Sequence, residues 1–389
     1  MVALVCWVIA LIVAVPLGMF VVECVAALGY RCRPVDESQS VRCSILIPAH
    51  DEELGLLPTL EILQAQLEPG DEIVVVADNC SDNTANIARE AGCVVLERFN
   101  DQQRGKGYAL AHGIEYLRAD PPEVVVIVDA DCQALPGAIK KLKCAARQYQ
   151  RPVQSSYLLK APPEASLPIK ISEFAVLVKN EVRCKGATTL GMSVPLLGSG
   201  MAFNWPDIST ISIASGEIVE DMKLGIELTC LGKGALFLND ARVESRLPST
   251  KEALQSQRER WEHGHMGMIQ KFTPPLFKAA LQRQSPAIFA FMLDLTVPPL
   301  SLLLLCSVAV FVAFTLLGLV LEVGAAAYLV SALVAAVITS VLVIWLALGR
   351  SILSPKELLF LPVYVVSKLG LYTGFFKKKQ TQWKRTERE

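Results

Sequence analysis

Uncharged, strongly hydrophobic residues concentrate in three long stretches of the chain and in a fourth, interrupted one. Residues 2–22, 295–321 and 323–349 contain no charged side chain, and about 20 apolar residues suffice to span the core of a bilayer. The first stretch predicts a membrane anchor, and the other two, separated only by Glu322, predict a transmembrane hairpin. The fourth stretch, residues 358–376, contains Lys368. It favours an interfacial or re-entrant helix, with a fourth span as the alternative.

Basic residues give these segments an orientation. No Lys or Arg precedes residues 2–22, whereas Arg31 and Arg33 follow them, and cytoplasmic flanks of membrane spans are enriched in basic residues. A cleaved export signal has a basic start and a shorter apolar core, so this stretch is expected to be retained. We therefore expect the amino terminus outside, the central region and the carboxyl terminus in the cytoplasm, and Arg350 at the cytoplasmic end of the hairpin.

Between the membrane segments, short apolar runs alternate with amphipathic stretches. We expect strands at residues 43–47, 72–77, 93–96 and 124–128, and helices at residues 54–66, 84–91, 106–118 and 137–148. Strands that alternate with helices are typical of right-handed βαβ units and of a parallel, Rossmann-like sheet. Residues 151–272 are less regular and predict a mixed sheet with long helices.

These patterns predict four parts in an α/β protein of the membrane. They are an anchor (1–30), a soluble α/β domain (40–285), a transmembrane hairpin (286–350), and an interfacial helix with a basic tail (351–389).

Composition narrows the class of protein further. The chain is 52% hydrophobic and carries a net charge of −1, so its bulk charge does not indicate nucleic-acid binding. The 11 cysteines show neither a C-x-x-C pair nor zinc-ligand spacing. They are therefore interpreted as reduced thiols of the core or the membrane, consistent with a reducing cytosol and not with a disulfide framework.

Two carboxylates follow the most hydrophobic of the expected strands. Asp129 and Asp131 come directly after residues 124–128, at the strand end where open α/β sheets bind ligands. Carboxylates without a basic neighbour need a cation or hydrogen-bond donors there, and Mg²⁺ or Mn²⁺ suits such oxygen ligands. An ordinary turn after the strand is the alternative, because D-x-D has many chance matches.

The first two strands also run into polar residues. Pro48 is expected to end the first strand, and the acidic residues after it to open a helix. Asp78 ends the second strand and could bind a base or a ribose, while Asp82 or Thr84 could cap the next helix.

Further candidate ligand groups follow along the chain. Lys106 stands between Gly105 and Gly107, which would let the backbone approach a phosphate; a solvated lysine in a loop is the alternative. Gly198, Ser199 and Gly200 form a flexible turn that could admit a bulky ligand. Glu220 and Asp221 begin a helix and could supply a general base or simply cap that helix.

The last candidate group lies on one face of an expected helix. Gln257, Arg260 and Trp261 stand at positions i, i+3 and i+4. An amide, a guanidinium and an indole together can bind phosphate oxygens and stack on a sugar. An amphipathic helix at the membrane surface is the alternative interpretation.

In this order, the motifs PAHDEE, ADNCSD, DAD, ED and Q-x-x-R-W resemble those of the membrane-integrated synthases of glycosyltransferase family 2. This group contains the cellulose, chitin-oligosaccharide and hyaluronan synthases, and the resemblance runs from about residue 44 to the tail. It implies a GT-A fold and an inverting transfer, dependent on Mg²⁺ or Mn²⁺, from a UDP-sugar to a growing polysaccharide or oligosaccharide. The alternatives are transfer of one sugar to a lipid acceptor, and a catalytically idle membrane scaffold or transporter.

The resemblance also implies a role for each motif residue. Asp221 matches the general base and Asp131 the metal ligand. The implied substrate-binding residues are Pro48, Ala49, Glu52, Asp78, Lys106, Asp129, Gly198, Ser199, Gly200, Glu220, Gln257, Arg260 and Trp261. Val219 stands where the family often has Thr.

The implied location and partners follow from the same resemblance. The location is the plasma (inner) membrane. The partners are a UDP-sugar, a saccharide or lipid-linked acceptor, membrane lipids and polysaccharide-export or assembly proteins, with no nucleic acid. The few expected spans make the layout most similar to that of the chitin-oligosaccharide synthases.

Overall fold

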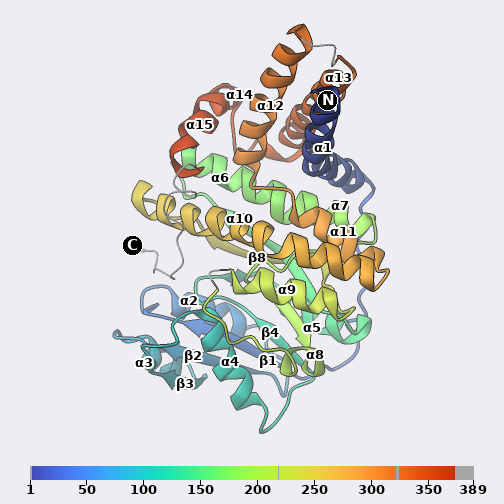
Figure 1. Cartoon of the computed structure of the whole chain (residues 1–389). Helices are drawn as coiled ribbons and strands as arrows, with labels where there is room; N and C mark the ends of the chain where they lie inside the picture. The colour runs from blue at the N-terminus through green and yellow to red at the C-terminus, as the bar shows by residue number, and fades with distance from the viewer. Residues whose placement is uncertain (1, 218, 321–323, 373–389) are drawn as a thin grey trace. The chain divides into compact units, whose positions relative to one another are not determined.

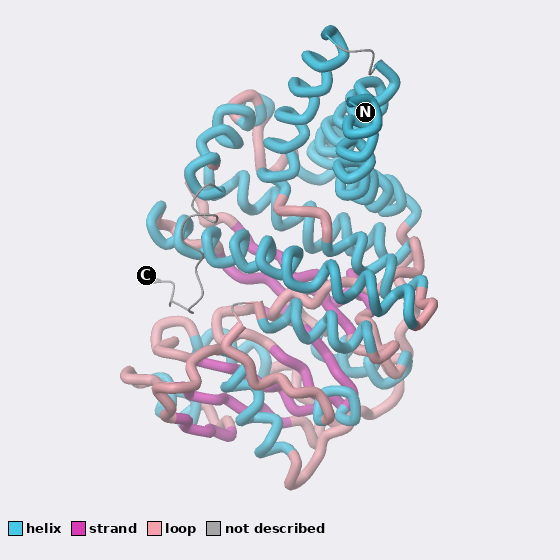
Figure 2. Tube along the Cα trace, viewed as in Figure 1, coloured by secondary structure: helices cyan, strands magenta, loops and turns pink. Residues whose placement is uncertain are grey.

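The computed structural model describes residues 2–217, 219–320 and 324–372. These residues form two compact units, each considered by itself. The sheet unit consists of residues 31–162 and 193–261, and the helical unit contains the described residues of 1–30, 163–192 and 262–372. All the described strands, magenta in Figure 2, belong to the sheet unit. The four boundaries expected from the sequence stay a prediction.

The sheet unit is organised around one eight-stranded sheet in the described part of the chain, with the order β3-β2-β1-β4-β7-β6-β8-β5. The strands are β1 (Cys43–Ala49), β2 (Glu72–Asp78), β3 (Val94–Arg98), β4 (Val124–Ile127), β5 (Gln133–Ala134), β6 (Val153–Lys160), β7 (Met201–Asn204) and β8 (Leu236–Arg246). Strands β3, β2, β1 and β4 are parallel, whereas β7 runs antiparallel to β4 and β6. Strand β8 is parallel to β6 and antiparallel to β5. The predicted α/β class, with a parallel first half and a mixed second half, is confirmed.

The helices between the first strands also match the sequence pattern. They are α2 (Leu56–Gln64), α3 (Thr84–Glu90), α4 (Lys106–Leu117) and α5 (Ala138–Tyr149), and each begins and ends within two residues of its predicted bounds. Helix α4 packs on β1 and β2, and α5 packs on β4, β6, β7 and β8 (Figure 1). A Cβ at Gly113 would lie 2.3 Å from Leu46 Cδ1, so this glycine allows α4 to approach the sheet closely.

The expectation that Pro48 ends β1 is wrong, because the strand continues to Ala49. The Leu46 carbonyl accepts a hydrogen bond from the Val128 N–H on the β4 side. Alternation of the backbone directs position 48 to the same side, where the pairing of β1 with β4 has already ended at Leu46 and Ile127. A proline costs no ladder hydrogen bond at such an edge position.

Further helices lie in the second half of the sheet unit. Helix α8 (Trp205–Ser209) and helix α9 (Glu220–Cys230) lie between β7 and β8. Helix α10 (Lys251–Gln282) follows β8, and its residues up to Trp261 belong to the sheet unit.

The helical unit contains the hydrophobic stretches. Its elements are α1 (Val2–Ala26), the 3₁₀ turn η1 (Ala27–Gly29), α6 (Leu167–Leu177), the π-helix η2 (Val178–Arg183), α7 (Cys184–Thr189), the rest of α10, α11 (Pro286–Leu295), α12 (Leu300–Val320), α13 (Gly324–Ile344), the π-helix η3 (Trp345–Gly349), α14 (Pro355–Leu358) and α15 (Leu361–Ser367).

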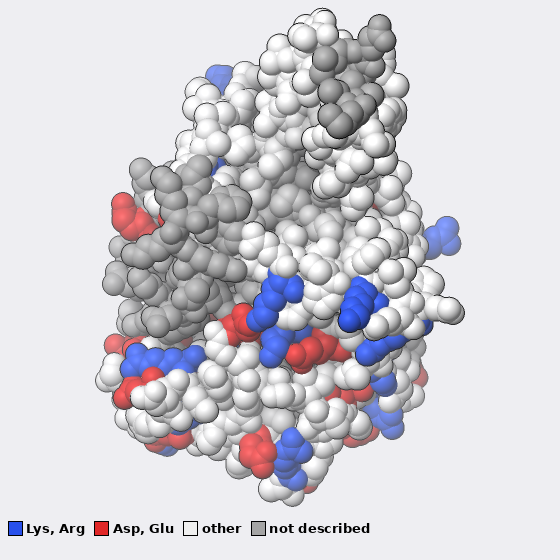
Figure 3. Space-filling view, viewed as in Figure 1, with Lys and Arg blue, Asp and Glu red and all other residues white. Residues whose placement is uncertain are grey.

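Three helical segments of the described chain are long and apolar enough to cross a membrane, namely Leu4–Gly29, Leu300–Val320 and Gly324–Gly349. They coincide with the three stretches expected to span. In the view of Figure 3 their surface is largely free of charged side chains. Glu322, the expected turn of the hairpin, lies outside the described residues.

A buried charge network joins three elements of the helical unit. Arg183 of η2 lies with Nε 2.5 Å from Glu23 Oε2 of α1 and with Nη2 2.6 Å from Asp294 Oδ1 of α11. All three residues are buried. Because removal of one partner from such a network leaves an uncompensated charge, the network holds α1, η2 and α11 in one arrangement.

Lys368, which interrupts the fourth hydrophobic stretch, is paired within the helical unit. Its Nζ lies 2.5 Å from Glu262 Oε1 of α10 and 5.6 Å from the centre of the Tyr364 ring. The apolar helical segment here is Leu361–Tyr372, which is shorter than a membrane span needs. The interfacial helix stays a prediction, and the tail with Lys377, Lys378 and Lys379 lies outside the described residues.

Candidate active site

Lys106 connects four segments of the sheet unit that lie far apart in the sequence. Its Nζ is 2.5 Å from Asp129 Oδ1, donates a hydrogen bond of 2.7 Å to the Gly198 carbonyl, and lies 3.8 Å from Glu220 Oε1. Lys106 is the first residue of α4, Asp129 follows β4, and Glu220 begins α9. The RGKG, DAD, GSG and ED motifs therefore meet at the carboxyl end of the parallel strands, where α/β sheets bind ligands.

Lys106 lies among several acidic side chains, which shift the pKa of Lys106 and of one another. Burial alone lowers the pKa of Lys106, but the Asp129 and Glu220 carboxylates outweigh it, and the net pKa is raised. Burial and, to a smaller extent, the nearby Asp221 raise the pKa of Glu220 to about 7, although Lys106 opposes the shift. One ammonium thus faces the carboxylates of Asp129, Glu220 and Asp221, and the group keeps an excess of negative charge.

Gly198 lies between these side chains in a backbone conformation that favours glycine. Its φ is +95°, and a Cβ there would lie 3.4 Å from Asp221 Oδ2 and 3.6 Å from Lys106 Nζ. The next residue, Ser199, is fully buried, and its Oγ accepts a hydrogen bond of 3.0 Å from the Asp129 N–H. At Gly200 a Cβ would collide with Ser155 Oγ, so packing against β6 accounts for that glycine.

Asp221 lies in the first turn of α9. Its Oδ1 accepts a hydrogen bond of 2.8 Å from the Met222 N–H, which orients the other oxygen. Glu220 and Asp221 line a pocket together with Leu110, Met201 and Ile213. The role of Asp221 as a general base stays a prediction.

Asp131 lies in the turn that follows β4. Asp129, Asp131 and Cys132 each offer a possible ligand atom, and these atoms lie within 4.8 Å of one another. Because Asp129 Oδ1 is already paired with Lys106, Asp131 is the better placed carboxylate for a hard cation such as Mg²⁺ or Mn²⁺. Its Oδ2 accepts a hydrogen bond of 2.7 Å from Ser245 Oγ of β8, a partner that the sequence did not indicate.

A second charged pair lies at the ends of β2 and β3. Arg98 Nη1 is 2.6 Å from Asp78 Oδ1, and Asn79 Nδ2 donates to the same oxygen at 3.0 Å. The Arg98 guanidinium also lies 5.6 Å from the centre of the Tyr108 ring. The sequence analysis missed Arg98, which lies two residues beyond the third predicted strand, 93–96, and which no local pattern marked.

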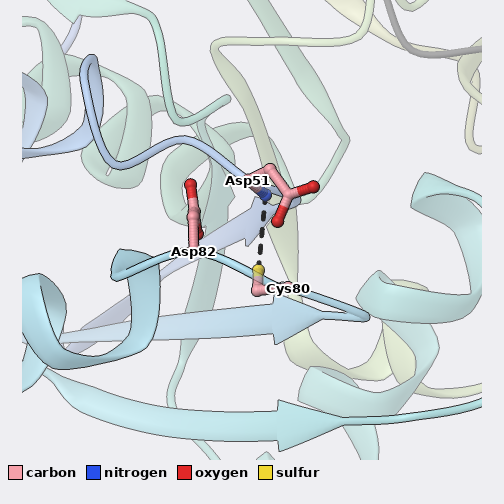
Figure 4. Close-up of side chains that lie close together, drawn as sticks. All are labelled: Asp51, Cys80 and Asp82. Atoms are coloured by element: carbon pink, nitrogen blue, oxygen red, sulfur yellow. Dashed lines mark hydrogen bonds between the residues drawn. The ribbon is translucent and has the colours of Figure 1, made fainter.

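Asp51, Cys80 and Asp82 lie close together in the loops after β1 and β2, and Figure 4 shows the hydrogen bond between Asp51 and Cys80. The Asp51 N–H donates to Cys80 Sγ at 3.4 Å. Asp82 Oδ1 accepts from the Thr84 N–H at the start of α3, but the N-cap of α3 is Asn83, so neither Asp82 nor Thr84 is the capping residue. Three residues predicted to bind the nucleotide base belong to these loops and to the end of β1: Pro48, Ala49 and Glu52.

The Q-x-x-R-W residues lie on α10. Gln257 is buried, and its Oε1 has no hydrogen-bond partner within the described part of the protein. A buried acceptor without a partner is costly unless a ligand supplies the donor. The roles of Gln257, Arg260 and Trp261 toward a substrate stay predictions.

The raised pKa of Glu220 has a consequence for stability. Between about pH 4.5 and 7 the folded protein retains a proton on Glu220 that the unfolded chain has released, so stability falls as the pH rises through this window. We expect the unfolding temperature to fall between pH 5 and 8, and to fall less in Glu220→Gln. Thermal unfolding of the detergent-purified protein measures this, and equal slopes for the two proteins would contradict it.

Comparison with known proteins gives matches over most of the chain. Residues 44–155 match the family model "Glycosyl transferase family 2", and residues 173–365 match "Glycosyl transferase family group 2". The chain is 24% identical over 275 residues to glucomannan 4-beta-mannosyltransferase 1 of Oryza sativa, which covers 62% of this chain but only 50% of the rice protein. It is 23% identical to the probable glycosyltransferase YdaM of Bacillus subtilis, over 89% of this chain and 87% of YdaM.

The structure is similar to that of the mannosyltransferase PcManGT from Pyrobaculum calidifontis, solved in complex with GDP-Man and Mn²⁺. The TM-score is 0.57 with 16% identity, and the match covers 96% of this chain and 100% of PcManGT. At this identity the likeness concerns the fold.

Proposed function

Because this chain carries glycosyltransferase family 2 domains on a GT-A fold, we propose that it is an inverting glycosyltransferase of the plasma (inner) membrane. It transfers a sugar from a UDP-sugar to a growing polysaccharide or oligosaccharide at the cytoplasmic face. The observation that carries this proposal is the meeting of Lys106, Asp129 and Asp221 around Gly198. These groups supply a cation, a carboxylate for the donor side and an oriented base within one site.

The divalent cation fits the residues present. Asp131 would hold Mg²⁺ or Mn²⁺, and a bound ion of this kind stabilises negative charge on a diphosphate leaving group. Lys106 places a second positive charge beside Asp129, and Arg260 would contact the diphosphate from α10. Together these cations allow the negatively charged donor to bind beside several carboxylates.

Asp221 acts on the acceptor. Its Oδ2 takes the proton from the acceptor hydroxyl as the hydroxyl oxygen attacks the anomeric carbon. Attack from the face opposite the leaving diphosphate inverts the configuration at that carbon. The carbon–oxygen bond to the diphosphate breaks, and the nucleoside diphosphate leaves.

The nucleotide base is recognised by Asp78 and Arg98. Asp78 Oδ1 is occupied by Arg98 and Asn79, which leaves Oδ2 to accept one N–H. On uracil, the N3–H would donate to this single acceptor, and the neighbouring carbonyl would accept from the Arg98 guanidinium. Guanine presents two adjacent N–H donors, which a carboxylate binds best with both oxygens. This arrangement supports a uridine donor.

GDP-mannose is the second candidate donor. The solved PcManGT structure contains GDP-Man and Mn²⁺, and relatives from Oryza sativa and Arabidopsis thaliana are named glucomannan 4-beta-mannosyltransferases. The acceptor is a saccharide or a lipid-linked saccharide, and the buried Oε1 of Gln257 is a candidate partner for one of its hydroxyl groups. A polymeric product would require export or assembly proteins as partners.

The test is release of nucleoside diphosphate by the detergent-purified protein from a panel of UDP-sugars and from GDP-mannose, with and without Mn²⁺ or Mg²⁺. We expect metal-dependent release from one UDP-sugar, with Asp221→Asn as the inactive control. The size of the product then distinguishes a polymer from a single transfer to a lipid.

Activity with GDP-mannose alone would overturn the assignment of a uridine donor. Absence of release from every donor, with saccharide and lipid acceptors supplied, would favour the idle scaffold.

A further inference from the structure

A buried hydroxyl group contacts the carboxylate that the proposed metal site depends on. Ser245 Oγ of β8 donates a hydrogen bond of 2.7 Å to Asp131 Oδ2, and Ser245 is 5% exposed. We propose that Ser245 is a positioning residue, which orients Asp131 so that its other oxygen faces a divalent cation. This inference rests on the proposed function, because it requires the cation at Asp131.

The strand pairing explains how two residues so far apart in the sequence meet. Strand β5 begins two residues after Asp131 and pairs antiparallel with β8, with Gln133 opposite Glu244 and Ala134 opposite Val243. Because antiparallel partners run in opposite directions, the residues just before Gln133 lie beside those just after Glu244. The short strand β5 therefore fixes the turn that carries Asp131 against Ser245.

The other oxygen of Asp131 also has a buried neighbour. Cys132 Sγ lies 3.7 Å from Asp131 Oδ1 and 3.7 Å from the Tyr157 hydroxyl of β6. Cys132 and Tyr157 are both buried. A thiol is a weak donor, whereas a hydroxyl-to-carboxylate bond is strong, so Ser245 dominates the orientation of the carboxylate.

An oriented carboxylate binds a cation more tightly than one that must first be ordered. Partners that hold a metal ligand in place typically contribute 10- to 100-fold to metal affinity. We expect Ser245→Ala to weaken Mn²⁺ binding by roughly this factor. The fold is expected to remain, because the variant removes one hydroxyl and leaves Asp131 beside Cys132.

The chain offers a matched control for a merely structural role. Ser44 Oγ of β1 donates a hydrogen bond of the same length, 2.7 Å, to Glu72 Oε1 of β2, and Ser44 is 1% exposed. This pair lies at the amino-terminal ends of the parallel strands, opposite the end that carries Asp131. Ser44→Ala removes a similar bond without touching the proposed metal site.

The experiment is a direct titration of the detergent-purified full chain with Mn²⁺, followed by electron paramagnetic resonance of the free ion, in the presence of UDP and, separately, of GDP. It compares wild type with Ser245→Ala, Ser245→Thr, Ser44→Ala and Asp131→Asn. Thermal unfolding without metal reports the stability of each protein. We expect a 10- to 100-fold higher Kd in Ser245→Ala, recovery in Ser245→Thr, which keeps the hydroxyl, and an unchanged Kd in Ser44→Ala.

The outcomes separate this inference from the function on which it rests. Loss of Mn²⁺ binding in Asp131→Asn with an unchanged Kd in Ser245→Ala would overturn the role of Ser245 and leave the metal site in place. Unchanged binding in Asp131→Asn would instead remove the proposed metal site. An equal change of Kd in Ser44→Ala and Ser245→Ala would show a general loss of stability and also overturn the inference.

Discussion

Replacement of Asp221 by Asn is expected to lower the turnover number by roughly 10²- to 10⁴-fold, the usual contribution of a positioned general base. The amide has the shape of the carboxylate and can still accept the hydrogen bond from the Met222 N–H. It cannot take a proton from an acceptor hydroxyl. Steady-state kinetics of nucleotide release, together with UDP binding by calorimetry, measure both properties.

Nucleotide binding should survive in Asp221→Asn, because the role proposed for Asp221 is toward the acceptor and not the donor. The control is Asp240→Asn, which makes the same chemical change at an exposed position of β8 and should leave turnover unaltered. Normal turnover by a folded Asp221→Asn protein would refute the assignment of the base.

Replacement of Lys106 by Met is expected to raise the KM for the donor by roughly 30-fold or more, since truncation of one partner of a buried charge pair costs about 2–5 kcal/mol. Without the ammonium, Asp129 and Glu220 lose their nearest cation. The remaining negative charge then repels the diphosphate of the donor. Initial-rate kinetics over a range of donor concentrations measure the effect.

A second change tests whether charge is the cause. Lys106→Arg keeps a positive charge beside Asp129, so it should retain more donor affinity than Lys106→Met. A Lys106→Arg variant no better than Lys106→Met would contradict the electrostatic explanation.

Lys143→Met is the matched control for the lysine. Lys143 is also buried between carboxylates, with its Nζ 2.5 Å from Asp71 Oδ2 and 3.0 Å from Glu68 Oε2. Asp71 directly precedes β2, at the end of the strands opposite the site. We expect lower stability in this variant and an unchanged KM for the donor.

The local pattern of side chains was sufficient for the first half of the sheet. Apolar runs such as residues 124–128, which are buried here, are typical of strands in the interior of a parallel sheet. The helices between the strands are recognisable because apolar residues recur every three to four positions. Pro48 is the exception, because its effect depends on which neighbour lies beside β1 at that position. Which strand lies beside β1 at this position is decided by the tertiary structure.

The candidate site divides in the same way. Asp129, Asp131, Asp78 and the Glu220–Asp221 pair were recognisable because polar residues at strand ends and helix starts stand out against apolar runs. Arg98 and Ser245 do not stand out in this way. Arg98 is the last residue of β3, a partly exposed strand, and Ser245 lies within β8, where polar and apolar residues are mixed. Their partners, Asp78 and Asp131, are 20 and 114 residues away in the sequence.

The sequence by itself determined the α/β class, the three long apolar helices and most of the acidic residues of the candidate site, because each depends on neighbours within a few residues along the chain. Only the tertiary structure determined which basic residue or hydroxyl group lies beside each carboxylate. The pairing of Lys106 with Asp129, the Arg98–Asp78 pair and the contact of Ser245 with Asp131 all join separate strands or helices. The strand order of the sheet brings these elements together, and strand order depends on contacts distributed over the whole unit.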